Sequence, residues 1–297
     1  MAELQSADAG LYSLGFGGDT FNTAWYVRAL TQVENLNVEY VTAVGGDPLS
    51  ARFETFLEKN CIGGRFVQRI PDRNIGLYLI SLKNAERSFT YWRNLSAAKL
   101  MADDINHITK ALKQADIIYF SGVTLAILDE PYRGNFLAAL HKMKNLGKMI
   151  VFDSNARPKL WNSPATMKAA TVAGYRVATV AVPTFEDDRQ IFGDVTPAAS
   201  AERIESYGVA EVIVKNGDKP SLVSVHGHLT SVSPNSVEHI IDTTGAGDSF
   251  NAGYIAARSN NYTPTEAAKF AHLVAARVIG GRGALIDMKN FSDLQFR

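Results

Sequence analysis

A turn of small residues, Gly245-Ala246-Gly247, is followed directly by a carboxylate, Asp248. An apolar pair at 240–241 precedes the turn and an amphipathic stretch follows it, so the turn is expected to open a helix. Backbone N–H groups at a helix N-terminus favour an anion such as phosphate. A carboxylate there repels the anion unless it takes a proton from the attacking group. Two interpretations stay open: Asp248 is a general base, or it is only a favourable first-turn acid.

Other kinds of site with a recognisable spacing are absent from the sequence. It contains no Gly-x-x-x-x-Gly-Lys-Ser/Thr, no Gly-x-Gly-x-x-Gly near its start, no Cys/His cluster and no Gly-x-Ser-x-Gly. These absences exclude P-loop enzymes, dinucleotide-binding enzymes, metal sites of the Cys/His type and serine hydrolases of the elbow type. An anion turn with an adjacent carboxylate suits phosphoryl transfer to an alcohol, which depends on positioning, electrostatics and one base for the hydroxyl.

Four apolar, β-rich runs predict the strands that must position these residues. They cover residues 117–120, 149–152, 177–182 and 212–214. Successive runs start about 30 residues apart, which is the size of a βαβ unit. The prediction is a doubly wound, mostly parallel α/β sheet, in which ligands bind beyond the carboxyl ends of the strands. The polar residues at those ends lie at 121–122, 153–155, 183–184 and 216–217.

Residues 64–96 have a different pattern and predict a small β lid outside the main sheet. Two β-rich runs, 75–82 and 87–92, flank a polar turn at 83–86. The hairpin is expected between a helix that ends near residue 60 and one that starts near residue 102. The aromatic side chains on this hairpin either cover a ligand or pack on the sheet or on a partner subunit. They are Tyr78, Tyr91 and Trp92.

The composition limits the partners. The chain has 297 residues, 46% of them hydrophobic, with 30 basic and 30 acidic residues. This balance removes the electrostatic reason for nucleic acid or an anionic membrane surface as the main partner. One cysteine, Cys61, cannot form an internal disulfide, and no leader or apolar run of about 18 residues is present. We expect one domain over residues 1–297, in the cytoplasm, with no nucleic acid and no membrane as partner.

Two glycine motifs resemble those of a known family. Residues 242–250, Asp-Thr-Thr-Gly-Ala-Gly-Asp-Ser-Phe, resemble the C-terminal signature of the ribokinase/PfkB family of sugar kinases, and residues 17–24, Gly-Gly-Asp-Thr-Phe-Asn-Thr-Ala, resemble its N-terminal motif. Stretches at 76–78, 91–93, 152–161 and 183–188 are similar to the 2-keto-3-deoxygluconate kinases within the family. The resemblance implies a ribokinase-like fold and ATP-dependent phosphorylation of this sugar acid at carbon 6. A fructokinase-like enzyme and a catalytically silent sugar-acid-binding protein are the alternatives.

The resemblance also implies roles for individual residues. Asp248 becomes the general base, and the backbone of Gly245, Ala246 and Gly247 becomes the anion hole. The helix N-terminus is expected to keep this carboxylate ionised, with a low pKa. The residues implied to line the sugar pocket are Gly18, Asp19, Asn22, Tyr78, Tyr91, Arg93 and Arg157.

Three of these pocket residues have alternatives. Arg93 and Arg157 are candidates for binding the substrate carboxylate, because guanidinium groups suit carboxylates, or they are solvated surface arginines. Asp19 either binds a sugar hydroxyl or caps a helix that begins near Thr20. A homo-oligomer formed through the lid is a further expectation.

On the nucleotide side, the resemblance places ATP along Lys215, Gly217 and the 245–247 turn, with the adenine near His272. Mg²⁺ is expected to accompany ATP, and it prefers water with one or two oxygen ligands. The family often has Asn-x-x-Glu where this chain reads Thr-Phe-Glu-Asp at 184–187, which leaves Asp187 as the metal candidate, through water. A monovalent cation stays open as a further cofactor.

The N-terminal region departs from the family pattern. Family members usually begin with an apolar strand that ends in a Gly-Glu-like turn, whereas this sequence starts at Met1-Ala2-Glu3-Leu4. The departure predicts an unfilled strand position in the sheet. Such a position leaves the hydrogen-bonding edges of its neighbours bare.

Overall fold

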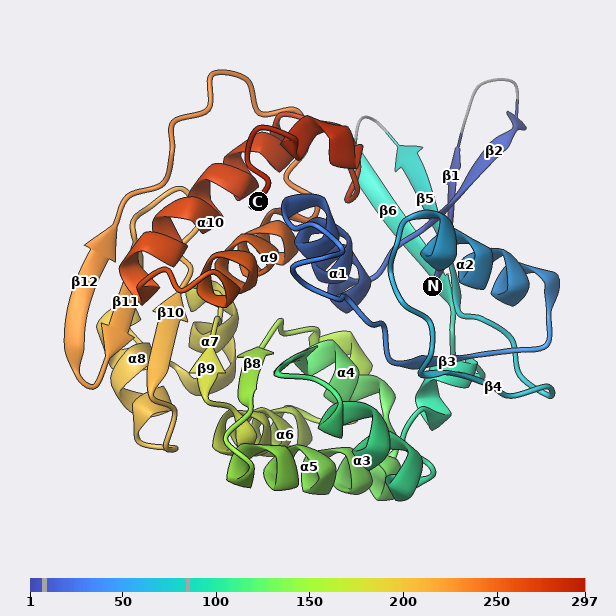
Figure 1. Ribbon diagram of the computed structural model, residues 1–297, viewed down its shortest axis with the longest axis horizontal. Coiled ribbons are helices and arrows are strands. Elements are labelled where there is room, and N and C mark those ends of the chain that lie inside the picture. Colours follow the sequence, from blue (N-terminus) through green and yellow to red (C-terminus); the bar gives the residue numbers. More distant parts are fainter. Residues whose placement is uncertain (7–9, 84–85, 297) are drawn as a thin grey trace.

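A six-stranded sheet forms the centre of the computed structural model, which describes residues 1–6, 10–83 and 86–296 (Figure 1). The strand order is β12-β11-β10-β9-β8-β7. The parallel strands are β7 (Ile117–Ser121), β8 (Met149–Asp153), β9 (Val180–Ala181) and β10 (Glu211–Val214), and the antiparallel ones are β11 (Ser221–Val225) and β12 (His228–Val232). The doubly wound, mostly parallel sheet is therefore confirmed. The strand expected at 177–182 is shorter, because the preceding helix continues to Val177.

Helices cover both faces of this sheet. On one face lie α1 (Asp19–Leu30), α9 (Ala246–Ser259) and α10 (Pro264–Ile279); on the other lie α3 (Ile105–Lys113), α5 (Glu130–Asn145), α6 (Pro164–Val177) and α8 (Pro197–Glu205) (Figure 1). Alternate strand residues face opposite layers, as the two-residue period of a strand requires. Val151 and Ile213 belong to the core under the first layer, and Phe152 and Val212 to the core under the second.

The ends of the helices follow from local chemistry. Asp47 precedes α2 (Pro48–Lys59) and accepts two backbone N–H groups of its first turn. Thr263 and Glu266 form a reciprocal capping box at the start of α10. The short helix α4 (Gly122–Ile127) begins directly after β7. The short helix α7 (Phe185–Phe192) begins after the segment that follows β9. In the described part of the chain, no helix has the length and apolarity needed to cross a membrane.

The lid is a four-stranded sheet with the order β2-β1-β5-β6. Its strands are β1 (Ala2–Ser6), β2 (Tyr12–Phe16), β5 (Leu77–Lys83) and β6 (Glu86–Trp92). The expected hairpin is present as β5 and β6, although residues 84–85 of its turn lie outside the described residues. β1 and β2 were not expected there. Local patterns do not reveal them, because β1 pairs in parallel with β5, about 75 residues away in sequence.

The first part of the expected lid segment belongs elsewhere. β4 (Val67–Arg69) pairs with β3 (Thr42–Val44) in a separate two-stranded sheet. Within the described residues, β3 and β7 each have one strand partner, and residues of both line one cavity of about 1250 Å³. Met1 and the following residues lead into the lid rather than the main sheet.

Candidate active site

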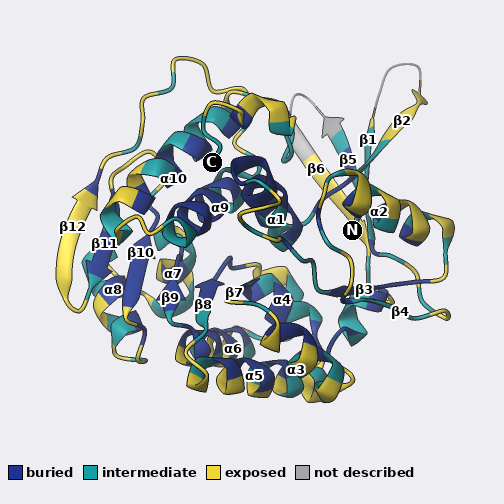
Figure 2. Ribbon diagram, in the orientation of Figure 1, coloured by how far each residue is buried: buried dark blue, intermediate teal, exposed yellow. Residues whose placement is uncertain are grey.

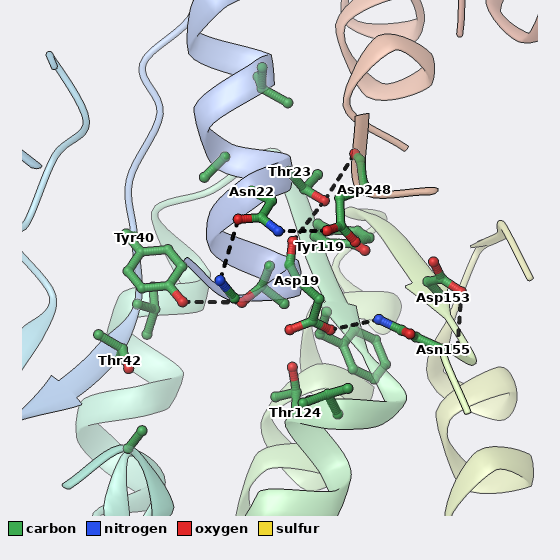
Figure 3. A pocket seen from close by; sticks show the side chains of 18 of the residues that line it. Asp19, Asn22, Thr23, Tyr40, Thr42, Tyr119, Thr124, Asp153, Asn155 and Asp248 are labelled. Carbon is green, nitrogen blue, oxygen red and sulfur yellow. Dashed lines mark hydrogen bonds between the residues drawn. The ribbon is translucent and has the colours of Figure 1, made fainter. Parts of the chain in front are cut away.

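Polar residues from several strands and helices meet in this cavity, at the carboxyl ends of the parallel strands (Figure 3). The N-termini of α1 and α9 and the lid hairpin complete its wall. It is lined by nearly all the residues proposed from sequence: Gly18, Asp19, Asn22, Tyr78, Tyr91, Arg93, Arg157, Asp187, Lys215, Gly245, Ala246, Gly247 and Asp248. Gly217 and His272 do not line it. The fold thus brings together residues that are up to 230 positions apart.

The turn at Gly245 opens α9, as expected from its residues. Gly245 adopts a left-handed conformation with φ of 79°, and a Cβ there would lie 2.7 Å from the Ala284 carbonyl oxygen. Glycine is therefore required by both backbone conformation and space. The Ala246 N–H donates to the Thr243 carbonyl at 3.2 Å. The following N–H groups, of Gly247 and Asp248, belong to the first helical turn, whose donors have no partner within the helix.

Asp248 is held by α1. Nδ2 of Asn22 donates to Oδ2 of Asp248 at 2.7 Å, and the Thr23 hydroxyl donates to the Asp248 carbonyl oxygen at 3.2 Å (Figure 3). The Gly18 N–H donates to Oδ1 of Asn22 at 3.3 Å, which fixes the amide with its donor toward the carboxylate. The carboxylate is thereby aimed into the cavity in one orientation.

The low pKa expected for Asp248 is wrong. Burial raises the pKa of this carboxyl to about 7, and the negative charge of Asp19 adds to the rise, while the Asn22 hydrogen bond opposes it. The helix N-terminus does stabilise the ionised form, but desolvation and a second carboxylate outweigh that effect. A base with a pKa near 7 is well matched to proton transfer near neutral pH.

Asp19 does not cap a helix, so that alternative is wrong. Gly18 occupies the N-cap position of α1, and Asp19 is the first helical residue. Its carboxylate accepts hydrogen bonds from the Ser121 hydroxyl and, at 3.0 Å, from Nδ2 of Asn155. Burial raises its pKa. Ser121 and Asn155 were not among the predicted site residues, although both lie at strand ends where polar residues were expected.

The lid contributes aromatic and cationic side chains. Tyr78 is nearly buried and donates to the Glu3 carboxylate of β1, whereas Tyr91 is half exposed. The Arg93 guanidinium lies 4.2 Å from the centre of the Tyr91 ring. Glu3 is a further residue that sequence reasoning missed, because its strand was not recognised.

Arg93 and Arg157 form a pair of cations in the same cavity. Nη1 of Arg157 donates to the Ala156 carbonyl at 2.7 Å, and neither arginine has an ion pair with a carboxylate in the described part of the chain. Burial lowers the pKa of Arg93, and the charge of Arg157 contributes to the same shift. Two guanidinium groups within electrostatic range of each other favour an anionic ligand between them.

The residues expected at the nucleotide are spread more widely. Lys215 is buried beneath the anion turn, bonded to Asp153 and Asn251. His272 is buried in the core, where Nε2 bonds to the Ser221 hydroxyl at 2.8 Å and the ring packs edge-on against Phe250. Burial lowers the pKa of His272. Its contacts are therefore with the protein interior.

Asp187, the metal candidate from the sequence, lines the cavity. Its Oδ2 accepts the Ala156 N–H at 3.1 Å, and burial raises its pKa to about 6. Among the described residues, no group of three or more His, Cys, Asp and Glu side chains is arranged to hold a metal ion. A single carboxylate fits a hydrated Mg²⁺ that also binds phosphate, because this ion keeps several of its waters.

Three comparisons with known proteins show which family and fold this chain shares. The sequence profile of the pfkB family of carbohydrate kinases matches residues 4–290. The 2-dehydro-3-deoxygluconokinase of Dickeya dadantii (strain 3937) is 37% identical over 295 residues, which cover 97% of this chain and 95% of that protein. The structure of 2-dehydro-3-deoxygluconokinase from Thermotoga maritima superimposes with a TM-score of 0.83 at 20% identity, over 99% and 95% of the two chains. Fructokinase from Vibrio cholerae O395, solved with fructose, ADP and calcium, gives a TM-score of 0.80 at 23% identity, over 99% and 92%.

Proposed function

The chain belongs to the pfkB family of carbohydrate kinases, and we propose that within it the protein transfers a phosphoryl group from ATP to 2-dehydro-3-deoxygluconate. This compound is also called 2-keto-3-deoxygluconate, and the product is its 6-phosphate. The Dickeya dadantii relative carries the name of this activity over nearly the whole length of both chains. The structural observation that carries the proposal is the pair of arginines, Arg93 and Arg157, without carboxylate partners in the described residues.

The charged groups divide the reaction between two sites in the cavity. The C6 hydroxyl of the sugar acid donates its proton to the Asp248 carboxylate as its oxygen attacks the γ-phosphorus of ATP, whose bond to the bridging oxygen breaks so that ADP leaves. The first-turn N–H groups at Gly247 and Asp248 stabilise the negative charge that develops on the transferred group. Nδ2 of Asn22 donates to Oδ2 of Asp248 at 2.7 Å and keeps this carboxylate in one orientation. The C6 hydroxyl of the sugar acid therefore meets an acceptor in a fixed position.

The sugar acid extends from Asp248 toward the lid. Its carboxylate binds between Arg93 and Arg157, each with a planar set of donors that matches two carboxylate oxygens. Asp19 is close enough to both groups for its negative charge to raise the pKa of Arg93 and that of Asp248. It is placed to accept a sugar hydroxyl. Tyr78 and Tyr91 cover the ring or chain of the sugar from the lid side.

ATP and a divalent cation complete the proposal. The turn at 245–247 receives the phosphates, and Asp187 holds a hydrated Mg²⁺, which would neutralise phosphate charge when bound. Gly217, which is exposed just after Lys215, is proposed to border the nucleotide. His272 is not part of this proposal, because it is buried in the core against Ser221 and Phe250. Family membership in a nucleotide-dependent kinase group supports ATP as the donor.

We also propose that the protein works in the cytoplasm, where ATP is available, and that it forms a homo-oligomer through the lid. Large apolar residues of the lid are exposed on its strands and the adjoining turn: Leu11, Tyr12, Phe89, Tyr91 and Trp92. These side chains lie at the two edge strands of the lid sheet and beside them, and exposed apolar side chains there support a second copy of the chain as partner. Sedimentation of the purified protein tests this, with Trp92→Glu expected to shift a dimer toward monomer.

Fructose is the competing substrate, and one experiment separates it from the sugar acid. ADP release is measured with each compound for the parent and for Arg157→Ala. We expect the parent to prefer the keto acid, and the variant to lose activity on the keto acid far more than on fructose. Equal activity on both compounds in the parent would favour fructokinase. No ADP release with either, while the keto acid still binds, would favour the silent binding protein.

A further inference from the structure

Three buried polar side chains form a closed group beneath the anion turn. Nζ of Lys215 donates to Oδ2 of Asp153 at 2.7 Å and to Oδ1 of Asn251 at 2.9 Å, and Nδ2 of Asn251 donates to Oδ2 of Asp153 at 2.7 Å. Their exposed fractions are 7% for Lys215, 3% for Asp153 and 0% for Asn251. Every member is bonded to both others. We refer to these residues as the buried triad.

The triad connects the start of α9 to the strands that border the cavity. Asp153 is the last residue of β8, and Lys215 directly follows β10. Asn251 lies on α9, three residues after Asp248, so the two side chains emerge about one helical turn apart. A Cβ added at Gly247 would lie 3.6 Å from Nζ of Lys215, so the ammonium lies directly beneath the turn.

Lys215 has little capacity left for a nucleotide. An ammonium has three N–H donors, and two of those of Lys215 are used by the triad. Asn251 also donates to the Tyr119 hydroxyl on β7 at 3.0 Å, which extends the connection to a third strand. The observed contacts are those of a group that holds elements together.

We propose that Asp153, Lys215 and Asn251 act as positioning residues, which hold Asp248 and the Gly247 turn against the sheet and neutralise the Asp153 carboxylate close to the base. The inference rests on the proposed role of Asp248 as general base. In this proposal Lys215 acts on Asp248 indirectly, through its bonds to Asp153 and Asn251. The family resemblance instead implies that Lys215 contacts ATP directly.

The charges around Asp248 explain why neutralisation matters. The charged groups that act on it from the surrounding elements are Asp19 on α1, Asp153 on β8 and Lys215 after β10. The titratable groups that feel its charge in turn are Tyr26 on α1, Tyr78 on β5 and Tyr119 on β7. Asp19 and Asp153 both raise the pKa of Asp248, and Lys215 opposes them. Loss of Lys215 alone leaves two carboxylates facing the base. Loss of both charged members leaves Asp19 as the one carboxylate facing Asp248, which restores the net charge that the parent has there.

The test compares Lys215→Met with the double variant Asp153→Asn/Lys215→Met. We expect Lys215→Met to lower kcat by about 100-fold, since small displacements of reacting groups cost that much. It should also move the acid limb of the pH profile of kcat/KM to higher pH. The double variant should return that limb toward its parent position while kcat stays low, because the anchor is still missing.

A matched control comes from the opposite end of the same helix. Arg258 on α9 pairs with Glu211 on β10 at 3.0 Å, so it joins the same two elements far from Asp248. Arg258→Met should lower the thermal midpoint without moving the pH profile. If Lys215→Met does not fold, Lys215→Arg replaces it. That variant should keep the pH profile, since its charge is kept, and lower kcat, since the larger guanidinium displaces the turn.

Two results would overturn the proposal. A Lys215→Met or Lys215→Arg enzyme that keeps its kcat and raises only the KM for ATP would show that Lys215 binds the nucleotide. A Lys215→Met enzyme that changes only in stability, as Arg258→Met does, would make the triad merely structural. Asp248→Asn is measured in parallel: if it stays active, the base assignment fails, and this outcome is separate from any result at Lys215.

Discussion

The two walls of the cavity differ in how they are built. On the sheet side, the carboxylate of Asp153 is buried, those of Asp19 and Asp248 are partly buried, and all three are hydrogen-bonded. Helix α9, which carries Asp248, is buried along most of its length (Figure 2). On the lid side, Tyr91 is 47% and Trp92 53% exposed, and the guanidinium of Arg93 rests on an aromatic ring. The carboxylates proposed for phosphoryl transfer are thus held in place before any ligand binds. The lid residues proposed to bind the sugar acid are exposed until the ligand covers them. Damage to the first wall should appear in kcat, and damage to the second in KM and selectivity.

Asp248→Asn should give the largest effect and separates the two walls most clearly. The amide keeps the shape and one hydrogen-bond acceptor but cannot take a proton, so kcat should fall by about 10²–10⁴. Binding of ATP and keto acid, measured by calorimetry, should stay within about tenfold. Asp218→Asn, at an exposed turn carboxylate, is the control. If Asp248→Asn kept more than a tenth of the parental kcat, Asp248 would not be the general base.

Arg157→Ala and Arg93→Ala should raise the KM for the keto acid by about 10–100-fold, because a hydrogen bond to a charged group contributes roughly 1.5–3 kcal/mol. The neutral analogue in which the carboxylate is an amide should lose much less. Arg52→Ala on the outer face of α2 is the control. If both ligands lose binding equally, the two arginines serve the phosphates or the fold instead.

The pH dependence should show opposite trends for activity and stability. The base must be ionised, and its pKa is about 7, so kcat/KM should rise up to that pH and then level off. Asn22→Ala removes a hydrogen bond to the ionised form and should shift the acid limb upward. The folded pKa lies above the ordinary 3.8, so the folded state binds more protons in that window, and the free energy of unfolding falls as pH rises through 7. Urea unfolding at pH 5 and 8 measures this fall, which should be smaller in Asp248→Asn.

The lid should respond to ligand with the smallest effect, a change in amide exchange. Strand β6, with residues 86–92, should exchange more slowly when the keto acid is added, and β8 should change little because it is already buried. ATP alone should have a weaker effect on β6, since the proposed nucleotide site lies on the other side of Asp248. Unchanged exchange in β6 with saturating keto acid would make the lid a static subunit contact, and the roles of Tyr91 and Arg93 would be withdrawn.

The sequence predicted the sheet side of the cavity better than the lid side. The glycine turn, Asp248 and the strand ends follow from local composition and period, and the fold confirms their convergence. The lid requires the parallel pairing of β1 with β5, and no local pattern encodes a partner that far along the chain. The pKa of Asp248 was wrongly predicted for the same reason, because its burial, the largest cause of the rise, and the approach of Asp19 both arise only on folding. The role of Lys215 likewise depends on Asp153 and Asn251, which tertiary structure brings to it.

The cavity that β3 and β7 share should make the protein sensitive to hydrostatic pressure. Pressure favours the state of smaller volume, and unfolding eliminates internal void space. The cavity of about 1250 Å³ opens to solvent, so the parts of it that add to the void are those that water leaves empty, such as the apolar stretch between the two sheets lined by Ala43, Leu112 and Ile118. Ligands that occupy it should reduce the volume change of unfolding, so high-pressure fluorescence with keto acid, ATP or both measures which part of the space each compound fills.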